Sequence, residues 1–159
     1  WRVTLEEAPL PNGKKKKVAR VYRCDSAHII ALTDEGNILL IREYRPFFKE
    51  NVWMLPTGRV NKEKDPKVTA MRELQEETGF RAEEISFLYS GNHSEGFPCV
   101  NHFFVARKLV KDPLPPDDTE LIEVHECSIP EAIEKVCGCE HVHMPSAYGL
   151  LRYAREHAL

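Results

Sequence analysis

The chain has 159 residues, of which 42% are hydrophobic and 30% charged, and its formal net charge is −3. We expect one domain over residues 1–159, because this length and composition are typical of a globular protein with a real core. The charge gives no electrostatic case for broad nucleic-acid binding. No apolar stretch approaches the ~20 residues of a membrane-spanning helix, so we expect no membrane association.

The first residue and the cysteines are relevant to the cellular compartment of the protein. The chain begins with Trp1 rather than methionine, so we expect a domain trimmed from a longer chain, with any targeting segment out of view. Five cysteines are an odd number and indicate no disulfide framework. We therefore expect an intracellular, reducing compartment, either the cytoplasm or the mitochondrial matrix. The tight spacing from Cys137 to His143 favours a helix end and loop over a zinc site.

The first elements in chain order are two strands, 1–5 and 17–22, around a turn at 9–13 that contains Asn-Gly. A basic run, 14–17, lies in this segment. We favour a solvated hairpin strand for it. The alternative is a contact for the phosphates of a longer substrate such as RNA.

The remaining elements alternate between strands and helices. β-branched and aromatic residues bounded by turn signals predict strands at 27–32, 38–42, 85–89, 100–109 and 121–127. Apolar periodicity and capping residues predict helices at 66–78, 130–136 and 145–157, and prolines predict a loop at 113–118. Strands between helices indicate an α/β sandwich.

The helix at 66–78 has clear ends and three clustered glutamates. Asp65 is a good N-cap, Pro66 suits the first helical position, and Gly79 follows the last turn. Glu73, Glu76 and Glu77 share one face, where each like-charge pair costs about 0.2–0.5 kcal/mol on an isolated helix. Such repulsion indicates a cation, and carboxylates suit Mg²⁺ or Mn²⁺. The alternative is an ordinary solvated acidic face.

The other residues of this helix should divide between its two sides. We expect Val68, Met71 and Leu74, opposite the glutamates, to pack on a sheet. Thr69 and Ala70 lie on the acidic side, and their small size should leave room there for a ligand.

The segment 72–80, Arg-Glu-Leu-Gln-Glu-Glu-Thr-Gly-Phe, resembles the second half of the Nudix box, and Gly58 stands at the leading glycine of the box. Segments 37–46, 55–58 and 120–128 resemble parts of ADP-ribose pyrophosphatase-like members. The resemblance covers most of the chain. It implies a Nudix α/β/α sandwich with a mixed β-sheet between helices.

Two positions depart from the family pattern. Six residues after Gly58 the box has a supporting glutamate, but this chain has Lys64, with Glu63 one residue out of phase. This departure puts full activity in doubt but leaves the main ligands in place. Met54 stands where a glutamate often precedes Leu-Pro in ADP-ribose pyrophosphatases, which affects the specific substrate more than the chemistry.

The resemblance implies hydrolysis of a nucleoside diphosphate linked to another moiety, with Mg²⁺ or Mn²⁺ as cofactor. Glu76 and Glu77 are the best metal ligands, while Glu73 is either a ligand or the base. Gly58 would bring a backbone carbonyl close to the metal, since glycine permits close approach. Arg72 would orient the carboxylates by charge-assisted hydrogen bonds.

Further site residues follow from the same resemblance. Arg45 and Arg42 are candidates for binding the phosphates, although an exposed turn arginine is an equal alternative for Arg45. A late loop supplies a second carboxylate in this family, for which Glu120 matches best. The other candidates for that carboxylate are Asp118 and Glu95, and an acidic surface loop is the alternative for all three. Candidates for stacking a base are Trp1 and Phe97, although both side chains suit ordinary packing.

The functional hypotheses differ in substrate and in class. The first is a pyrophosphohydrolase acting on ADP-ribose-like or other nucleotide-containing small molecules. The second is a 5′-pyrophosphohydrolase of triphosphorylated RNA with RNA or RNA-processing protein partners, as in kinetoplastid mitochondria. The third is a catalytically impaired Nudix domain that binds nucleotide or RNA, which Lys64 favours and the intact glutamates oppose. Related enzymes are often homodimers, so the resemblance also leaves a homodimer open.

Overall fold

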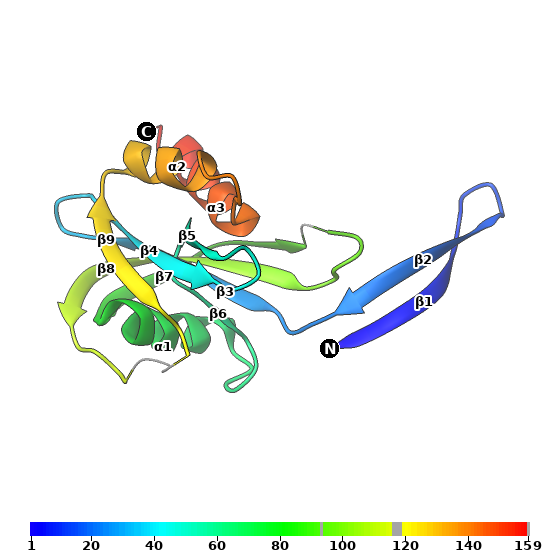
Figure 1. Ribbon diagram of the computed structural model, residues 1–159, viewed down its shortest axis with the longest axis horizontal. Coiled ribbons are helices and arrows are strands. Elements are labelled where there is room, and N and C mark those ends of the chain that lie inside the picture. Colours follow the sequence, from blue (N-terminus) through cyan, green and yellow to red (C-terminus); the bar gives the residue numbers. More distant parts are fainter. Residues whose placement is uncertain (93, 116–118, 159) are drawn as a thin grey trace.

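The computed structural model describes residues 1–92, 94–115 and 119–158. A mixed sheet lies between α1 (Pro66–Thr78) on one face and α2 (Ile129–Cys137) with α3 (Met144–Glu156) on the other (Figure 1). The α/β/α sandwich predicted from the resemblance is confirmed. Within the described ranges, no helix is long and apolar enough to cross a membrane.

The central sheet has the strand order β5-β4-β3-β8-β7, with β6 paired to β3 and β9 paired to β4. Strands β3 and β8 run parallel, whereas the other pairs are antiparallel, which makes the sheet mixed. The strands are β3 (Ser26–Leu32), β4 (Ile38–Arg45), β5 (Glu50–Met54), β6 (Thr57–Arg59), β7 (Phe80–Asn92), β8 (Val100–Lys111) and β9 (Ile122–Cys127).

The first two strands form a separate hairpin. β1 (Arg2–Pro9) pairs antiparallel with β2 (Lys15–Tyr22), and the pair projects away from the sandwich (Figure 1). Gly13 closes the turn with φ of 79°, in the left-handed region that glycine adopts without strain. Both strands extend further than the sequence predicts, because pairing continues up to the turn.

Pairing also explains the differences within the central sheet. The predicted strand at 85–89 is longer, since β7 pairs with β8 from Phe80 to Asn92. Strands β5 and β6 were not predicted. The segment Thr57–Arg59 has a weak intrinsic preference for strand, and it is extended because it pairs with the start of β3, where Ala27 lies opposite Gly58.

Buried apolar residues form a cluster on each face of the sheet. On one face Leu74 and Ala70 of α1 pack against Ile29 and Phe104. On the other face α2 and α3 pack against Ile30, Leu40 and Val105. These two clusters fix the helices on the sheet, and therefore fix the position of every side chain that α1 presents.

The bounds of α1 agree with the prediction, but its orientation does not. The Asp65 side chain accepts from the Lys67 N–H, and Gly79 ends the helix with φ of 78°. Val68 and Met71 are exposed, so the prediction that they pack on the sheet is wrong; Leu74 is buried as predicted. Thr69 and Ala70 are fully buried. Their small side chains let the helix approach the sheet, so they bring the glutamate side inward instead of leaving space for a ligand.

This orientation predicts different costs for two truncations on the same helix. Leu74→Ala should lower the free energy of unfolding by about 2–5 kcal/mol, because it leaves a cavity against the sheet. Val68→Ala, on the exposed side, should change it by less than about 0.5 kcal/mol. Urea unfolding followed by circular dichroism measures both, and a larger loss for Val68→Ala would contradict the orientation.

Candidate active site

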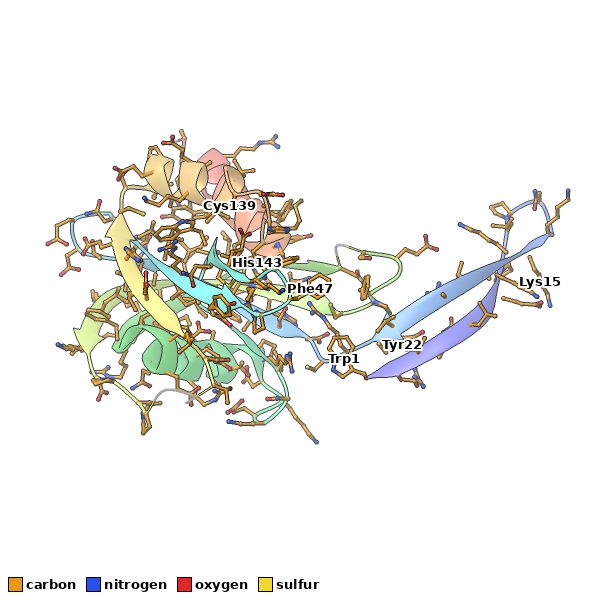
Figure 2. All side chains as sticks on the ribbon, viewed as in Figure 1. Trp1, Lys15, Tyr22, Phe47, Cys139 and His143 are labelled. Carbon is orange, nitrogen blue, oxygen red and sulfur yellow. The ribbon has the colours of Figure 1, made fainter. Side chains whose placement is uncertain are left out.

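A cavity of about 860 Å³ opens beside α1, β3, β4, β6 and the residue that precedes α3. Carboxylates and cations line it together, which is an arrangement suited to a ligand with both a metal ion and phosphates. The carboxylates are Glu43, Glu73, Glu76, Glu77 and Glu120, and the cations are Arg23, Arg45, Arg59, Lys62 and Arg72. Trp1 and His143 also line the cavity, and both lie toward the hairpin side of the sandwich (Figure 2).

The guanidinium of Arg72 organises the acidic side of this cavity. Its Nε donates to Glu63 Oε1 at 2.7 Å, its Nη2 donates to Glu73 Oε1 at 2.7 Å, and its Nη1 donates to Glu76. The Arg72 side chain is 18% exposed, so these charge-assisted bonds lie largely out of solvent. One cation thus brings three carboxylates together.

Gly58 makes room for one of these carboxylates. A Cβ added at this position would lie 1.9 Å from Glu73 Cδ, far inside any allowed contact. The glycine of β6 therefore lets the Glu73 side chain lie directly against the strand. Burial raises the pKa of Glu73, the nearby Arg72 opposes the rise, and the charges of Glu76 and Glu120 add to it.

Glu77 is the most deeply placed carboxylate of the cluster. It is 8% exposed, and its Oε2 accepts a hydrogen bond of 2.7 Å from the backbone N–H of Thr57. Burial raises its pKa well above the usual value, and the neighbouring charges of Glu73 and Glu120 raise it further. A buried carboxylate among like charges is stabilised by a cation.

Glu63 occupies a supporting position in spite of its shift in sequence. Its Oε1 accepts from Arg72, and its Oε2 accepts from Thr69 Oγ1 at 3.2 Å. The hydrogen bond from Arg72 lowers the pKa of Glu63. The next residue, Lys64, has φ of 59°, a left-handed conformation that is uncommon for lysine. The turn thus places Glu63 against Arg72.

The two arginines predicted to bind phosphates lie in different places. Arg45 lines the cavity and pairs with Glu43 at 2.7 Å. Arg42 is not among the lining residues of the described chain; its guanidinium lies 3.6 Å from Glu123 and over the ring of Trp53. Successive side chains of a strand point to opposite faces of the sheet. Arg42 and Arg45 are an odd number of residues apart, so they lie on opposite faces of β4.

The other candidates from the sequence also divide into residues that line the cavity and residues that do not. Glu120 and Trp1 line the cavity, whereas among the described residues Glu95 and Phe97 do not. Asp118 lies outside the described residues. The cavity is therefore compatible with Glu120 as the late carboxylate.

Cysteines and the basic run lie apart from this cluster. All five cysteines are free. Cys137 ends α2, and the Cys139 thiol donates to the Lys135 carbonyl, as expected for a helix end. The basic run lies at the far end of the hairpin, where Figure 2 labels Lys15.

Several lining residues were missed from the sequence, among them Glu43, His28 and His143. Glu43 is buried, and burial raises its pKa. Glu43 follows Arg42 in the segment 37–46, which resembles the family. Alternate side chains of a strand share a face, so its position relative to Arg45 was the signal that it lines the same site. His28 is buried and contacts Thr57 Oγ1 and Asn101 through its two ring nitrogens. His143 lies more than sixty residues after the box, and no local motif marks it.

The donor set fits a hard divalent metal ion. Glu73, Glu76 and Glu77 bring carboxylate oxygens to one side of the cavity, and burial raises the pKa of Glu73 and Glu77. In the part of the chain that the structure describes, no three His, Cys, Asp or Glu side chains are already gathered in a metal-binding geometry. Arg72 instead holds Glu73 and Glu76 through ion pairs.

Comparisons with known proteins agree with this geometry. The NUDIX domain model matches residues 23–141. The methanol dehydrogenase activator of Bacillus methanolicus is 32% identical over 138 residues, which cover 85% of this chain and 75% of that protein. The ADP-ribose pyrophosphatase of Bacillus subtilis (strain 168) is 31% identical over 149 residues, which cover 92% of this chain and 80% of that protein.

A solved structure described as an ADP compounds hydrolase has the same fold. It superposes with a TM-score of 0.79 at 20% identity, covering 94% of this chain and 82% of that one. With the family match over residues 23–141, these findings show that the chain belongs to the Nudix family. It is a hydrolase of phosphoanhydride bonds.

The buried carboxylate generates a prediction about stability and pH. Because the pKa of Glu77 is raised in the folded state, its contribution to stability is full below the unfolded pKa of about 4.3 and is lost as pH rises through the folded pKa. Glu77→Gln does not titrate, and its amide oxygen still accepts from Thr57. Without metal, Glu77→Gln should therefore be more stable than the parent at pH 7, and this advantage should shrink at pH 4.

Urea unfolding in EDTA at the two pH values tests this prediction. Adding Mg²⁺ at pH 7 should stabilise the parent more than Glu77→Gln, since the parent alone retains the charge. If the two proteins differed equally in their free energy of unfolding at pH 4 and pH 7, the charge of Glu77 would not destabilise the folded protein.

Proposed function

We propose that the protein is a metal-dependent pyrophosphohydrolase that cleaves the diphosphate of a nucleoside diphosphate linked to another moiety, with ADP-ribose-like compounds as the first substrate class. The observation that carries the proposal is the cluster of Glu73, Glu76 and Glu77, which lines one cavity with Arg72 and Arg45. The names of the relatives support the substrate class, since one is an ADP-ribose pyrophosphatase.

The charges of the cavity suit a diphosphate held between a metal ion and arginines. A diphosphate carries dense negative charge, which repels an attacking water and must be neutralised. Arg45 and Arg23 would bind its oxygens from one side of the cavity. Trp1 and Phe48 line the same cavity and offer aromatic surfaces for a base.

Mg²⁺ or Mn²⁺ would be held by Glu73, Glu76 and Glu77, with Gly58 allowing the close approach of Glu73 to β6. When bound, such an ion polarises phosphoryl oxygens and lowers the pKa of water. The protein supplies the orientation: Arg72 fixes Glu73 and Glu76, and the Thr57 N–H fixes Glu77. Glu120 or Glu73 would accept the proton from water.

The two other hypotheses have less support. The basic run that would contact RNA lies at the far end of the hairpin and lines no part of the cavity in the described residues (Figure 2). A binding module without catalysis was suggested by Lys64. Glu63 makes the supporting contact with Arg72 from the preceding position, which weakens that suggestion. We place the enzyme in a reducing compartment, the cytoplasm or the mitochondrial matrix, because its five cysteines are free.

Removing the proposed metal ligands should abolish turnover without unfolding the protein. Glu76→Gln combined with Glu77→Gln keeps the size of both side chains but removes two charges. Hydrolysis of ADP-ribose with Mg²⁺ should fall at least about 100-fold, since even outer contacts of metal ligands are worth 10- to 100-fold. Release of phosphate-containing products, measured by chromatography, gives the rate.

Glu83→Gln is the matched control, because Glu83 is an exposed glutamate of β7 that lines no part of this cavity. It should hydrolyse ADP-ribose at the parental rate. If the double variant also turned over substrate like the parent while folded, the metal assignment would be wrong.

We also propose that the protein forms a homodimer in which a second copy covers the hairpin. Val3 and Leu5 are each 72% exposed on one face of β1, and the hairpin forms a sheet of its own. An isolated two-stranded hairpin is marginally stable in water, so an additional packing partner would stabilise it.

Sedimentation velocity tests the dimer. Val3→Asp with Leu5→Asp should convert a dimeric parent to a monomer, because it places charges in the apolar face. Lys16→Ala, on the opposite face of the hairpin, should leave the dimer intact. A parent that sediments as a monomer at high concentration would rule the dimer out.

A further inference from the structure

His143 lies at the boundary between the cavity and the core. It is the residue before α3, yet its side chain makes no capping hydrogen bond to that helix. The ring instead lines the cavity, and its centroid lies 5.8 Å from that of His28. A histidine in this place is available for a contact with a ligand.

A buried serine determines which nitrogen of this ring carries the proton. Ser146 is fully buried, and its Oγ accepts from the Leu55 N–H at 2.9 Å. The same Oγ lies 2.7 Å from His143 Nδ1. A serine hydroxyl has one proton, and Nδ1 is its only acceptor among the described residues, so the hydroxyl donates to Nδ1. A neutral imidazole that accepts at Nδ1 carries its proton on Nε2.

The surroundings keep this ring neutral. Burial, together with the smaller effect of the charges of Arg45 and Arg23, lowers the pKa of His143 to about 4. Both arginines line the same cavity. The ring therefore presents an uncharged N–H to the cavity that Arg45 and Arg23 also line.

The Nε2 atom is open to a ligand. Among the described residues, the buried side-chain nitrogens that lack a partner belong to Arg42, His102 and Arg152. His143 Nε2 makes no hydrogen bond to any of the described residues and is not one of these buried atoms, so it is an accessible nitrogen on a ring that lines the cavity. An open donor beside two arginines suits an anionic oxygen.

We propose that His143 binds the substrate by donating its Nε2–H to a phosphate oxygen of the nucleoside diphosphate, and that Ser146 is the positioning residue that sets this tautomer. The inference rests on the proposed function and extends it to a residue outside the Nudix box. The neutral His143 ring can orient the phosphate through its N–H. Because the ring stays neutral, it does not compete for a proton with the glutamates that would hold the metal ion.

Equilibrium binding of ADP and adenosine in the presence of Mg²⁺, measured by calorimetry, tests the contact. His143→Ala should weaken ADP binding about 10- to 100-fold, the range expected for a hydrogen bond to a charged group. His143→Gln retains an N–H donor and should weaken ADP binding less. Adenosine, which lacks phosphate, should bind all three proteins equally. His125→Ala, outside the cavity, is the control.

The ¹⁵N chemical shifts of the His143 ring test the role of Ser146 separately. The parent should show protonation at Nε2, and Ser146→Ala should shift population toward Nδ1–H. A parent ring protonated at Nδ1, or equal ADP affinity in the parent and His143→Ala, would overturn the inference. If no substrate is hydrolysed but His143→Ala still weakens ADP binding, the proposed hydrolysis fails while the phosphate contact stands.

Discussion

One guanidinium, that of Arg72, donates hydrogen bonds to three carboxylates on the acidic side of the cavity. Without it, Glu73 and Glu76 would repel each other in a largely buried place, where the repulsion is stronger than in water. Arginine suits this role because its five donors lie in one rigid plane, which lysine cannot reproduce. The geometry of the glutamates therefore depends on Arg72 before any metal ion is considered.

That arrangement in turn depends on how closely α1 lies against the sheet. Thr69 and Ala70 bring the helix in, Gly58 leaves space for the Glu73 side chain, and the Thr57 N–H holds Glu77. The contacts at Gly58 and Thr57 join α1 to the short strand β6. A strand of three residues thus connects the core to the catalytic machinery proposed here.

The ends of α1 and the identity of its charged residues could be predicted, because caps and box residues are local patterns. Its orientation could not, since Val68 and Met71 are apolar and only the sheet decides that Thr69 and Ala70 are buried. Strand β6 depends on a partner in β3, a long-range contact that no window of sequence contains.

The same limit applies to the cavity. The glutamates of the box were predictable because they share a helix face, whereas Glu43 and His143 reach the cavity from separate elements. The sequence did not show that Glu63 takes the supporting role lost at Lys64. This became clear only from the turn, in which the backbone at Lys64 is left-handed. Sequence patterns identify residues along one element, and tertiary structure decides which elements meet.

³¹P NMR of ADP-ribose incubated with the protein and Mg²⁺, beside a sample with EDTA, is the most direct test of metal-dependent hydrolysis. We expect the diphosphate signals to be replaced by those of AMP and ribose 5-phosphate only in the sample with Mg²⁺. An unchanged spectrum, from folded protein that still binds nucleotide, would contradict the proposed hydrolysis of ADP-ribose.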